Sequence, residues 1–329
     1  PFQGGAAGLF GYELARGLEN IPSARINDLA MPTLAAGLYD VVVAFDHYQK
    51  RSWILSQGFP EMAARARRKR ARARLAQMRD WLQGPLNRPR PDSHQHVPVT
   101  ELAPQFDVGL EGVTSNFPAA SYREMIERAV EYIHAGDIFQ VNLAQRLLCP
   151  ARSPSAELYL KLRTNNPAPY AGYFNLGDWQ ICSTSPECFL TLRDGQVETR
   201  PIKGTRGRLD SAEADLFAGD ELQLSEKDRA ENVMIVDLLR NDLSRVCTAE
   251  SVCVEQLFQL EDYAFVKHLV STVRGRLRPQ FNVFDLLRAC FPGGSITGAP
   301  KIRAMEIIAE LEREPRGIYT GCILSLIHI

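Results

Sequence analysis

Apolar and polar positions follow two different periods along this chain, and the switch between them predicts where strands and helices lie. Short runs of strand-forming residues, bounded by Gly, Pro, Asp or Ser, predict strands at 38–45, 52–55, 138–148, 170–174, 180–183, 188–193 and 196–199. Asp194-Gly195 joins the last two runs and is typical of a tight hairpin. We therefore expect antiparallel pairing in the middle of the chain.

Helical periodicity or helix-favouring composition predicts four longer helices, at 61–83, 121–135, 228–243 and 300–311. For the second, Ser121 is the expected N-cap, Glu124 completes a capping box, and Gly136 ends the helix. For the fourth, Pro300 occupies a favoured position in the first turn. Strands and helices without regular βαβ alternation indicate an α+β fold.

The segment 84–104 divides the chain, because it holds five prolines and reads as a linker or long loop. We expect residues 1–104 to be the remnant of an N-terminal subdomain and residues 105–329 to be the main domain. The first residue is Pro1, without an initiator Met. We therefore expect the chain to begin inside a longer protein.

Composition and charge exclude several classes of protein. The chain has 38 Lys plus Arg against 39 Asp plus Glu, which gives no overall attraction to nucleic acid or to an anionic membrane. No apolar run reaches the roughly 18 residues of a membrane span, and no H-E-x-x-H or C-x-x-C pattern is present. The seven cysteines are odd in number, which favours free thiols and a cytoplasmic location.

One local basic patch departs from this balance. The expected helix at 61–83 carries eight basic residues, among them Arg65, Arg68, Arg72 and Arg79. A nucleic-acid-binding arm is one interpretation. We favour a solvated helix, because the run lacks interleaved aromatic residues and the rest of the chain is not basic.

A Gly-rich loop, Phe291 to Pro300, precedes the last helix and invites an anion-binding interpretation, since amides at a helix N-terminus favour negative charge. It is not a Walker motif, because Gly298 is followed by Ala299-Pro300-Lys301. A phosphate, a carboxylate-bearing ligand or a simple tight turn all remain open for this loop.

Four other residues could carry chemistry. Lys203 lies between a strand and a Gly-Thr turn, and it can act as a nucleophile only if its pKa falls from about 10.4 towards neutrality. Glu187 could be a general acid if its site is apolar. Asp228 and Glu231 lie three apart at a helix start and share a face, where they could bind a hard cation or simply complement the helix dipole.

Taken together, these segments resemble the chorismate-utilising enzymes. The resemblance covers most of the chain outside the basic helix and the Pro-rich linker. It rests on six stretches that occur in order, namely 4–12, 137–146, 185–187, 201–205, 228–242 and 291–301. It implies two antiparallel sheets packed face to face with helices outside, here incomplete at the C-terminus.

Two positions choose among the branches of that family. Members that add water to chorismate carry a lysine where this chain has Gln140, which favours an ammonia-using branch. Lys203 stands where anthranilate synthases usually have Ala. The resemblance is therefore greatest to the aminodeoxychorismate synthase component I branch, which aminates chorismate at C4 in folate biosynthesis with ammonia from a glutaminase.

The resemblance also implies roles for individual residues. Glu187 would protonate the leaving 4-hydroxyl of chorismate, and Lys203 would attack C2 before ammonia adds at C4. Glu231 would hold Mg²⁺ against the ring carboxylate. The substrate pocket implied by the family comprises Gln140, Gly204, Thr205, His268, Ser295 and Tyr319.

The chain departs from the family pattern at its end. The resemblance implies a further C-terminal part with a carboxylate-binding arginine, a Gly-rich loop and a second magnesium-binding glutamate. Residues 322–329 replace an expected strand, which suggests an artefact of truncation or frameshift, and we expect the 329-residue chain to be inactive alone. Anthranilate synthase component I is the alternative within the family. An RNA-binding protein and a non-catalytic protein that docks the glutaminase are the alternatives outside it, while no membrane partner is expected and nucleic acid is disfavoured.

Overall fold

The computed structural model describes residues 2–85 and 97–326, and it confirms an α+β fold. Its helices are α1 Ala64–Gln83, α2 Ala119–His134, α3 Ser155–Asn165, α4 Ala212–Leu224, α5 Glu226–Ser244, α6 Val283–Cys290 and α7 Lys301–Leu311. Short 3₁₀ segments are η1 Tyr12–Gly17, η2 Val99–Glu101, η3 Ala249–Ser251 and η4 Gly294–Ile296.

Every strand pair in the described part of the chain is antiparallel. The strands are β1 Gly5–Phe10, β2 Leu34–Tyr39, β3 Val41–Asp46, β4 Arg51–Ser56, β5 Phe106–Asp107, β6 Thr114–Ser115, β7 Gln140–Val141, β8 Leu147–Leu148, β9 Tyr170–Asn175, β10 Gln180–Ser185, β11 Cys188–Arg193, β12 Gln196–Arg200, β13 Ile202–Gly207, β14 Cys253–Asp262, β15 Val266–Arg276, β16 Gly298–Ala299 and β17 Cys322–Leu326.

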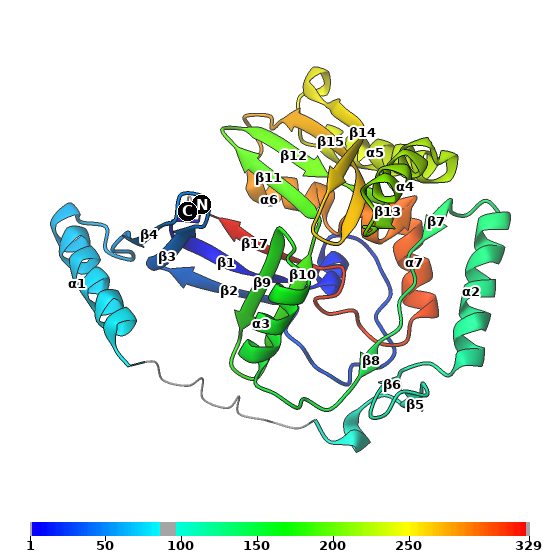
Figure 1. Cartoon of the computed structure of the whole chain (residues 1–329), viewed down its shortest axis with the longest axis horizontal. Coiled ribbons are helices and arrows are strands. Elements are labelled where there is room, and N and C mark those ends of the chain that lie inside the picture. Colours follow the sequence, from blue (N-terminus) through cyan, green and yellow to red (C-terminus); the bar gives the residue numbers. More distant parts are fainter. Residues whose placement is uncertain (1, 86–96, 327–329) are drawn as a thin grey trace.

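The largest sheet runs in the order β11-β12-β15-β13, and β14 pairs with β15 as well. Helices α5 and α6 pack against it, and their shared core contains Val197, Val236, Leu243, Val273 and Leu286, each at most 5% exposed. Figure 1 shows this sheet in the upper part of the molecule and the β17-β1-β2 sheet below it. The packed sheet and helices therefore form a rigid support for the polar side chains of the candidate site.

A second core supports the region below the largest sheet. Tyr12, Ile21, Phe291, Met305 and Ile308 are buried together, so η1 and the loop before α7 pack onto α7 itself. Phe291 opens the Gly-rich loop. Its packing edge-on against Phe189 of β11, with ring centroids 6.3 Å apart, ties the loop to the largest sheet.

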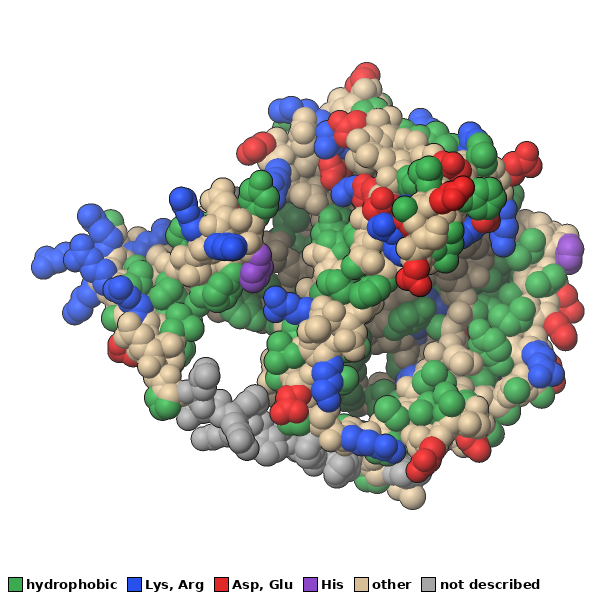
Figure 2. Space-filling model, viewed as in Figure 1, with side chains coloured by type: hydrophobic (Ala, Val, Ile, Leu, Met, Phe, Trp, Pro, Cys, Tyr) green, Lys and Arg blue, Asp and Glu red, His purple; other side chains and the backbone are tan. Residues whose placement is uncertain are grey.

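The basic helix α1 lies apart from these cores, beside the β3-β4 hairpin, and none of its residues is buried (Figures 1 and 2). Arg70 and Arg74 pair with Asp40, which fixes one face of the helix to the hairpin. Arg65, Arg68, Arg72 and Arg79 lie on the exposed part of the helix. A solvated helix matches this arrangement.

Several local predictions are confirmed. Strands form at β4, β9, β10, β11 and β12, and Asp194 and Gly195 both adopt positive φ, as the predicted hairpin requires. The predicted strand at 38–45 divides at Asp40 into β2 and β3. The four longer helices are present, although α7 begins at Lys301 with Pro300 as its N-cap.

Two predictions are wrong. Helix α2 begins at Ala119 with Pro118 as its N-cap, so Ser121 lies inside the first turn and forms no cap with Glu124. The expected strand at 138–148 is also absent, because only β7 and β8 at its two ends pair with neighbours. The segment between them is held instead by side chains from the end of α7 and the loop that follows it, described below.

The two ends of the described chain meet in one sheet. Strand β17 pairs with β1, from Ala6 opposite Leu326 to Phe10 opposite Cys322, so the described part of the suspected artefact forms a regular strand. This pairing joins residues from both predicted domains, and the boundary near 104 stays a prediction. Most of the Pro-rich linker, 86–96, and the last residues, 327–329, lie outside the described residues.

Two further expectations concern cysteines and membranes. Cys149, Cys188, Cys247, Cys253, Cys290 and Cys322 are free thiols. Within residues 2–85 and 97–326 no helix combines the length and the apolar character that a membrane crossing needs.

Candidate active site

The Gly-rich loop and the segment 139–142 form the base of the candidate site. Strand β16, at the end of the loop, pairs with β7, and Asn142 N donates to Thr297 O at 2.8 Å. Gly298 makes this approach possible: its φ is +146°, and a Cβ there would lie 2.2 Å from the Gln140 carbonyl oxygen. A glycine is therefore required where the two segments touch.

Lys203 reaches the same place from β13. The register between β13 and β15 shifts between Ile202 and Thr205, so Lys203 and Gly204 lie in a bulge. Gly204 has φ +92°, and a Cβ there would lie 2.9 Å from Leu222 and 3.1 Å from the Cβ of Asp228. The bulge places the Lys203 side chain opposite α5 and the Gly-rich loop.

The Lys203 amine is held by two acceptors. Its Nζ donates to the Ser295 carbonyl at 2.9 Å and lies 3.2 Å from Oε1 of Glu231, and the side chain is 13% exposed. A lysine in bulk solvent would have neither contact. The amine is therefore oriented towards α5, which carries Glu231, and towards the Gly-rich loop, which carries Ser295.

Glu187 contacts Ser295, the same residue of the Gly-rich loop that accepts from Lys203. Ser295 Oγ donates to Glu187 Oε1 at 2.6 Å, while the Ser295 carbonyl accepts from Lys203. Burial raises the pKa of Glu187, and the Ser295 hydroxyl and the Lys203 charge oppose that rise. A carboxyl that keeps its proton to higher pH than an ordinary glutamate suits a general acid.

Glu231 projects from the first turns of α5, which Ser225 caps by accepting from Asp228 N. Its Oε1 accepts from Gln140 Nε2 at 2.9 Å as well as facing Lys203. Asp228, the other acid of this face, pairs instead with Arg206 at 3.2 Å. The two acids therefore have different cationic partners, Lys203 for Glu231 and Arg206 for Asp228.

One atom of the Gln140 side-chain amide has no hydrogen-bond partner among the described residues. Its Nε2 also donates to Asn142 Oδ1 at 3.1 Å, but its Oε1 is buried without a hydrogen-bond partner among the described residues. A buried unpaired acceptor is costly and is commonly satisfied by a water or a ligand with a donor.

Thr205 and His268 form a neighbouring pair across β13 and β15. Thr205 Oγ1 and His268 Nδ1 are 2.9 Å apart, and the two residues are directly opposite in the register. Burial lowers the pKa of His268, which favours the neutral ring at pH 7. The hydrogen bond between the two side chains fixes the orientation of the His268 ring.

Tyr319 lies outside this group. It is 57% exposed, and its ring lies 5.7 Å from the guanidinium of Arg316. Sequence reasoning also missed one residue at the centre of the site, Asn142, which contacts both Gln140 and Ser295. Its position two residues after Gln140 was the available signal, because alternate residues of an extended segment share a face.

The donor set tests whether magnesium fits. No group of three or more His, Cys, Asp or Glu side chains in the described ranges could hold a metal ion. Mg²⁺, however, commonly takes one or two carboxylates, and water and ligand oxygens fill the other positions. Glu231 offers such a carboxylate at the site, so a magnesium ion shared with a bound anion fits the residues present.

Among the described residues, the arrangement brings together an oriented amine, a buried carboxyl with a raised pKa, a carboxylate bound to that amine and to Gln140, and an unpaired amide oxygen. These groups can protonate a leaving hydroxyl, position or attack a carbon acceptor, and orient a small nucleophile. Gly204, Thr205 and Ser295 line the same region through the contacts described above.

Comparisons with known proteins show which family the chain is similar to. The family described as chorismate binding enzyme matches residues 1–327. The aminodeoxychorismate synthase component 1 of Klebsiella aerogenes is 42% identical over 323 residues, which are 98% of this chain and 65% of that protein. The anthranilate synthase component 1 of Streptomyces coelicolor is also 42% identical, over 98% of this chain and 62% of its own length.

The fold is likewise similar to that of a solved relative. The crystal structure of anthranilate synthase component I from Streptococcus pneumoniae TIGR4 superposes with a TM-score of 0.81 at 33% identity, and covers 98% of this chain and 68% of that one. The chain thus spans somewhat under two thirds of the length of the curated relatives named above. The family match over residues 1–327 and these identities establish that the chain belongs to the chorismate-binding enzyme family.

Proposed function

We propose that the protein aminates chorismate at C4, giving 4-amino-4-deoxychorismate, with ammonia supplied by a glutaminase partner. The observation that carries the proposal is the position of Lys203, whose amine lies 3.2 Å from Glu231 and 2.9 Å from the Ser295 carbonyl. Gln140 and Glu187 lie in the same hydrogen-bonded group. The relatives named aminodeoxychorismate synthase component 1 support this choice.

In the proposed reaction, the neutral Lys203 amine bonds to C2 while both conjugated ring double bonds shift and the C4–O bond breaks. Glu187 donates its proton to the departing hydroxyl, which leaves as water. Ammonia then bonds to C4, both double bonds shift back, and the C2–N bond breaks to release the neutral Lys203 amine. A proton from the new C4 ammonium returns to Glu187. Because C2 is occupied during the first step, amination there is prevented.

Two further residues have proposed parts in this reaction. Gln140 Oε1 is the unpaired buried acceptor of the site and can accept an N–H from the incoming ammonia. Glu231 would bind Mg²⁺ together with the ring carboxylate, and the ion would neutralise that carboxylate and fix its orientation. The Thr205–His268 pair, Gly204 and Tyr319 are proposed to line the substrate pocket.

Anthranilate synthesis is the second candidate, because a relative with that name reaches the same identity over the same share of the chain. It would aminate C2 instead of C4. The presence of Lys203 favours the first candidate, since an amine bonded to C2 blocks amination at that carbon.

The test is a product assay on the full gene product, with chorismate, ammonium chloride and MgCl₂, with and without an added aminodeoxychorismate lyase. p-Aminobenzoate that forms only when the lyase is present supports C4 amination. Direct formation of fluorescent anthranilate contradicts it and favours the second candidate.

Two variants separate covalent catalysis by Lys203 from a purely electrostatic role. Lys203→Arg keeps a cation opposite Glu231 but removes the nucleophilic amine, so we expect loss of C4 amination. Lys161→Arg, on the exposed face of α3, is the matched control and should leave the rate unchanged. Full activity of Lys203→Arg would remove the covalent step.

A further inference from the structure

Asn142 joins the two sides of the candidate site through one side chain. Its Nδ2 donates to the Ser295 carbonyl at 3.0 Å, and its Oδ1 accepts from Gln140 Nε2 at 3.1 Å. Only this orientation of the amide satisfies both contacts, because reversing it would place two acceptors together at Ser295 and two donors at Gln140.

The partners of Asn142 are the atoms that hold the proposed reacting groups. The Ser295 carbonyl also accepts from Lys203 Nζ, and Gln140 Nε2 also donates to Glu231. Glu231 in turn faces Lys203. Asn142, Ser295, Lys203, Glu231 and Gln140 therefore form a closed ring of hydrogen bonds and one ion pair.

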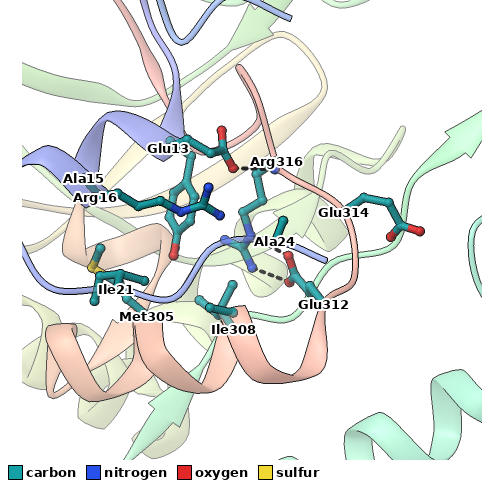
Figure 3. Close-up of a pocket in the computed structure, with 12 residues that line it drawn as sticks. Glu13, Ala15, Arg16, Ile21, Ala24, Met305, Ile308, Glu312, Glu314 and Arg316 are labelled. Carbon is teal, nitrogen blue, oxygen red and sulfur yellow. Dashed lines mark hydrogen bonds and ion pairs between the residues drawn. The ribbon is translucent and has the colours of Figure 1, made fainter. Parts of the chain in front are cut away.

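The backbone of Asn142 is held from behind by a buried ion pair. Arg316 and Glu312, whose side chains are 3% and 7% exposed, pair at 2.6 Å (Figure 3). Arg316 Nη2 donates to the Asn142 carbonyl, and Glu312 Oε1 accepts from Ala144 N at 2.9 Å. These contacts replace strand pairing for the segment after Gln140 and keep it in one place.

We propose that Asn142 is a positioning residue, which fixes the Ser295 carbonyl and the Gln140 amide and thereby keeps the Lys203 amine in its reactive place. The proposal rests on the proposed function for its effect on turnover. Its effect on the geometry of Lys203 does not depend on the identity of the product.

The experiment compares Asn142→Ala and Asn142→Leu with the parent. Leu preserves the volume of the side chain and removes its polar atoms. The control is Asn282→Ala, which removes the N-cap of α6, where Asn282 accepts from Phe284 N and Asp285 N. The control variant loses stability without changing the hydrogen-bonded ring around Lys203. It therefore separates general destabilisation from displacement of the Lys203 amine.

Two readouts are used. The rate of reductive methylation at Lys203, measured by peptide mass spectrometry on the folded 329-residue chain, should rise about threefold or more in both Asn142 variants, because the amine loses a fixed acceptor. In the full gene product kcat should fall about 10- to 100-fold with little change in KM for chorismate, since misplacement of reacting atoms by about 1 Å has effects of that size. Asn282→Ala should change neither.

The outcomes separate the two proposals. Faster methylation of Lys203 together with a parent product other than the C4 amine would support positioning and refute the proposed function. A parent that makes the C4 amine, with Asn142 variants that behave as Asn282→Ala does, would refute positioning. If neither Asn142 variant folds by circular dichroism, the residue serves folding and the positioning proposal is overturned.

Discussion

The ion pair between α5 and α7 gives a prediction whose size follows from the structure. Lys301 Nζ donates to Asp242 Oδ2 at 2.5 Å and to the Cys290 carbonyl at 2.9 Å. The two side chains are 11% and 5% exposed. Lys301→Met keeps the chain length and removes the charge, which leaves a buried carboxylate without its partner. We expect the free energy of unfolding to fall by about 3–5 kcal/mol near pH 8.

The loss should depend on pH. Burial raises the pKa of Asp242 from 3.8 to about 6, and Lys301 opposes that rise. A raised pKa means that the folded state binds the proton more tightly. The contribution of Asp242 is therefore most favourable below pH 3.8 and declines by about 3 kcal/mol as pH rises through 6. Without Lys301 the pKa should rise further, so the deficit of the variant should grow between pH 4.5 and pH 8.

The assay is urea unfolding of the 329-residue chain at pH 4.5, 6 and 8, followed by tryptophan fluorescence and circular dichroism. Lys161→Met, at an exposed site on α3, is the matched control. The double variant Asp242→Leu with Lys301→Met should recover most of the lost stability, because no buried charge remains. A deficit below about 1 kcal/mol at pH 8, or one equal at pH 4.5 and pH 8, would refute the reasoning.

Three other predictions follow from the site and the surface. Burial raises the pKa of Glu187, and kcat should fall as pH rises through that pKa, because the general acid loses its proton. Glu187→Gln should lower kcat at least about 100-fold and abolish this fall of kcat with pH. Gly298→Ala places a Cβ 2.2 Å from the Gln140 carbonyl and should reduce stability by about 2 kcal/mol or more, whereas Gly207→Ala, with no atom within 4 Å, should change it by less than about 1 kcal/mol in urea unfolding. Replacing Arg65, Arg68, Arg72 and Arg79 with Gln should leave the melting temperature within about 2 °C, and the parent should show no steep salt-dependent RNA binding in filter assays; such binding, lost in the variant, would favour the RNA-binding alternative.

Local sequence signals were sufficient for elements whose structure depends on residues close together in the chain. The hairpin at Asp194-Gly195 and the helix α5 depend on neighbouring residues, and both were predicted. The prediction of a strand at 138–148 was wrong because the strand-forming residues of this segment do not show which part of the chain binds its backbone. That partner is the Arg316–Glu312 pair, about 170 residues away in the chain, which binds the backbone that a strand would have used.

The candidate site shows the same division. Resemblance of motifs selected Lys203, Glu187 and Glu231, and the structure brings these three residues together. It did not single out Asn142, because the contact between Asn142 and Ser295 joins residues 153 positions apart in the chain. The resemblance also places Tyr319 in the pocket; its ring is 57% exposed beside Arg316, and that role stays a prediction.

The contacts of Lys203 define what activation of this residue requires. An amine attacks carbon through its lone pair, whereas the Lys203 amine here faces a carboxylate oxygen 3.2 Å away. The ion pair with Glu231 therefore orients the amine and at the same time keeps it directed at Glu231 instead of at a bound ligand. Because the Ser295 carbonyl is a neutral second acceptor, the amine can keep its position when Glu231 turns to another partner. Binding of a ligand that draws Glu231 away would thus release the nucleophile without displacing it.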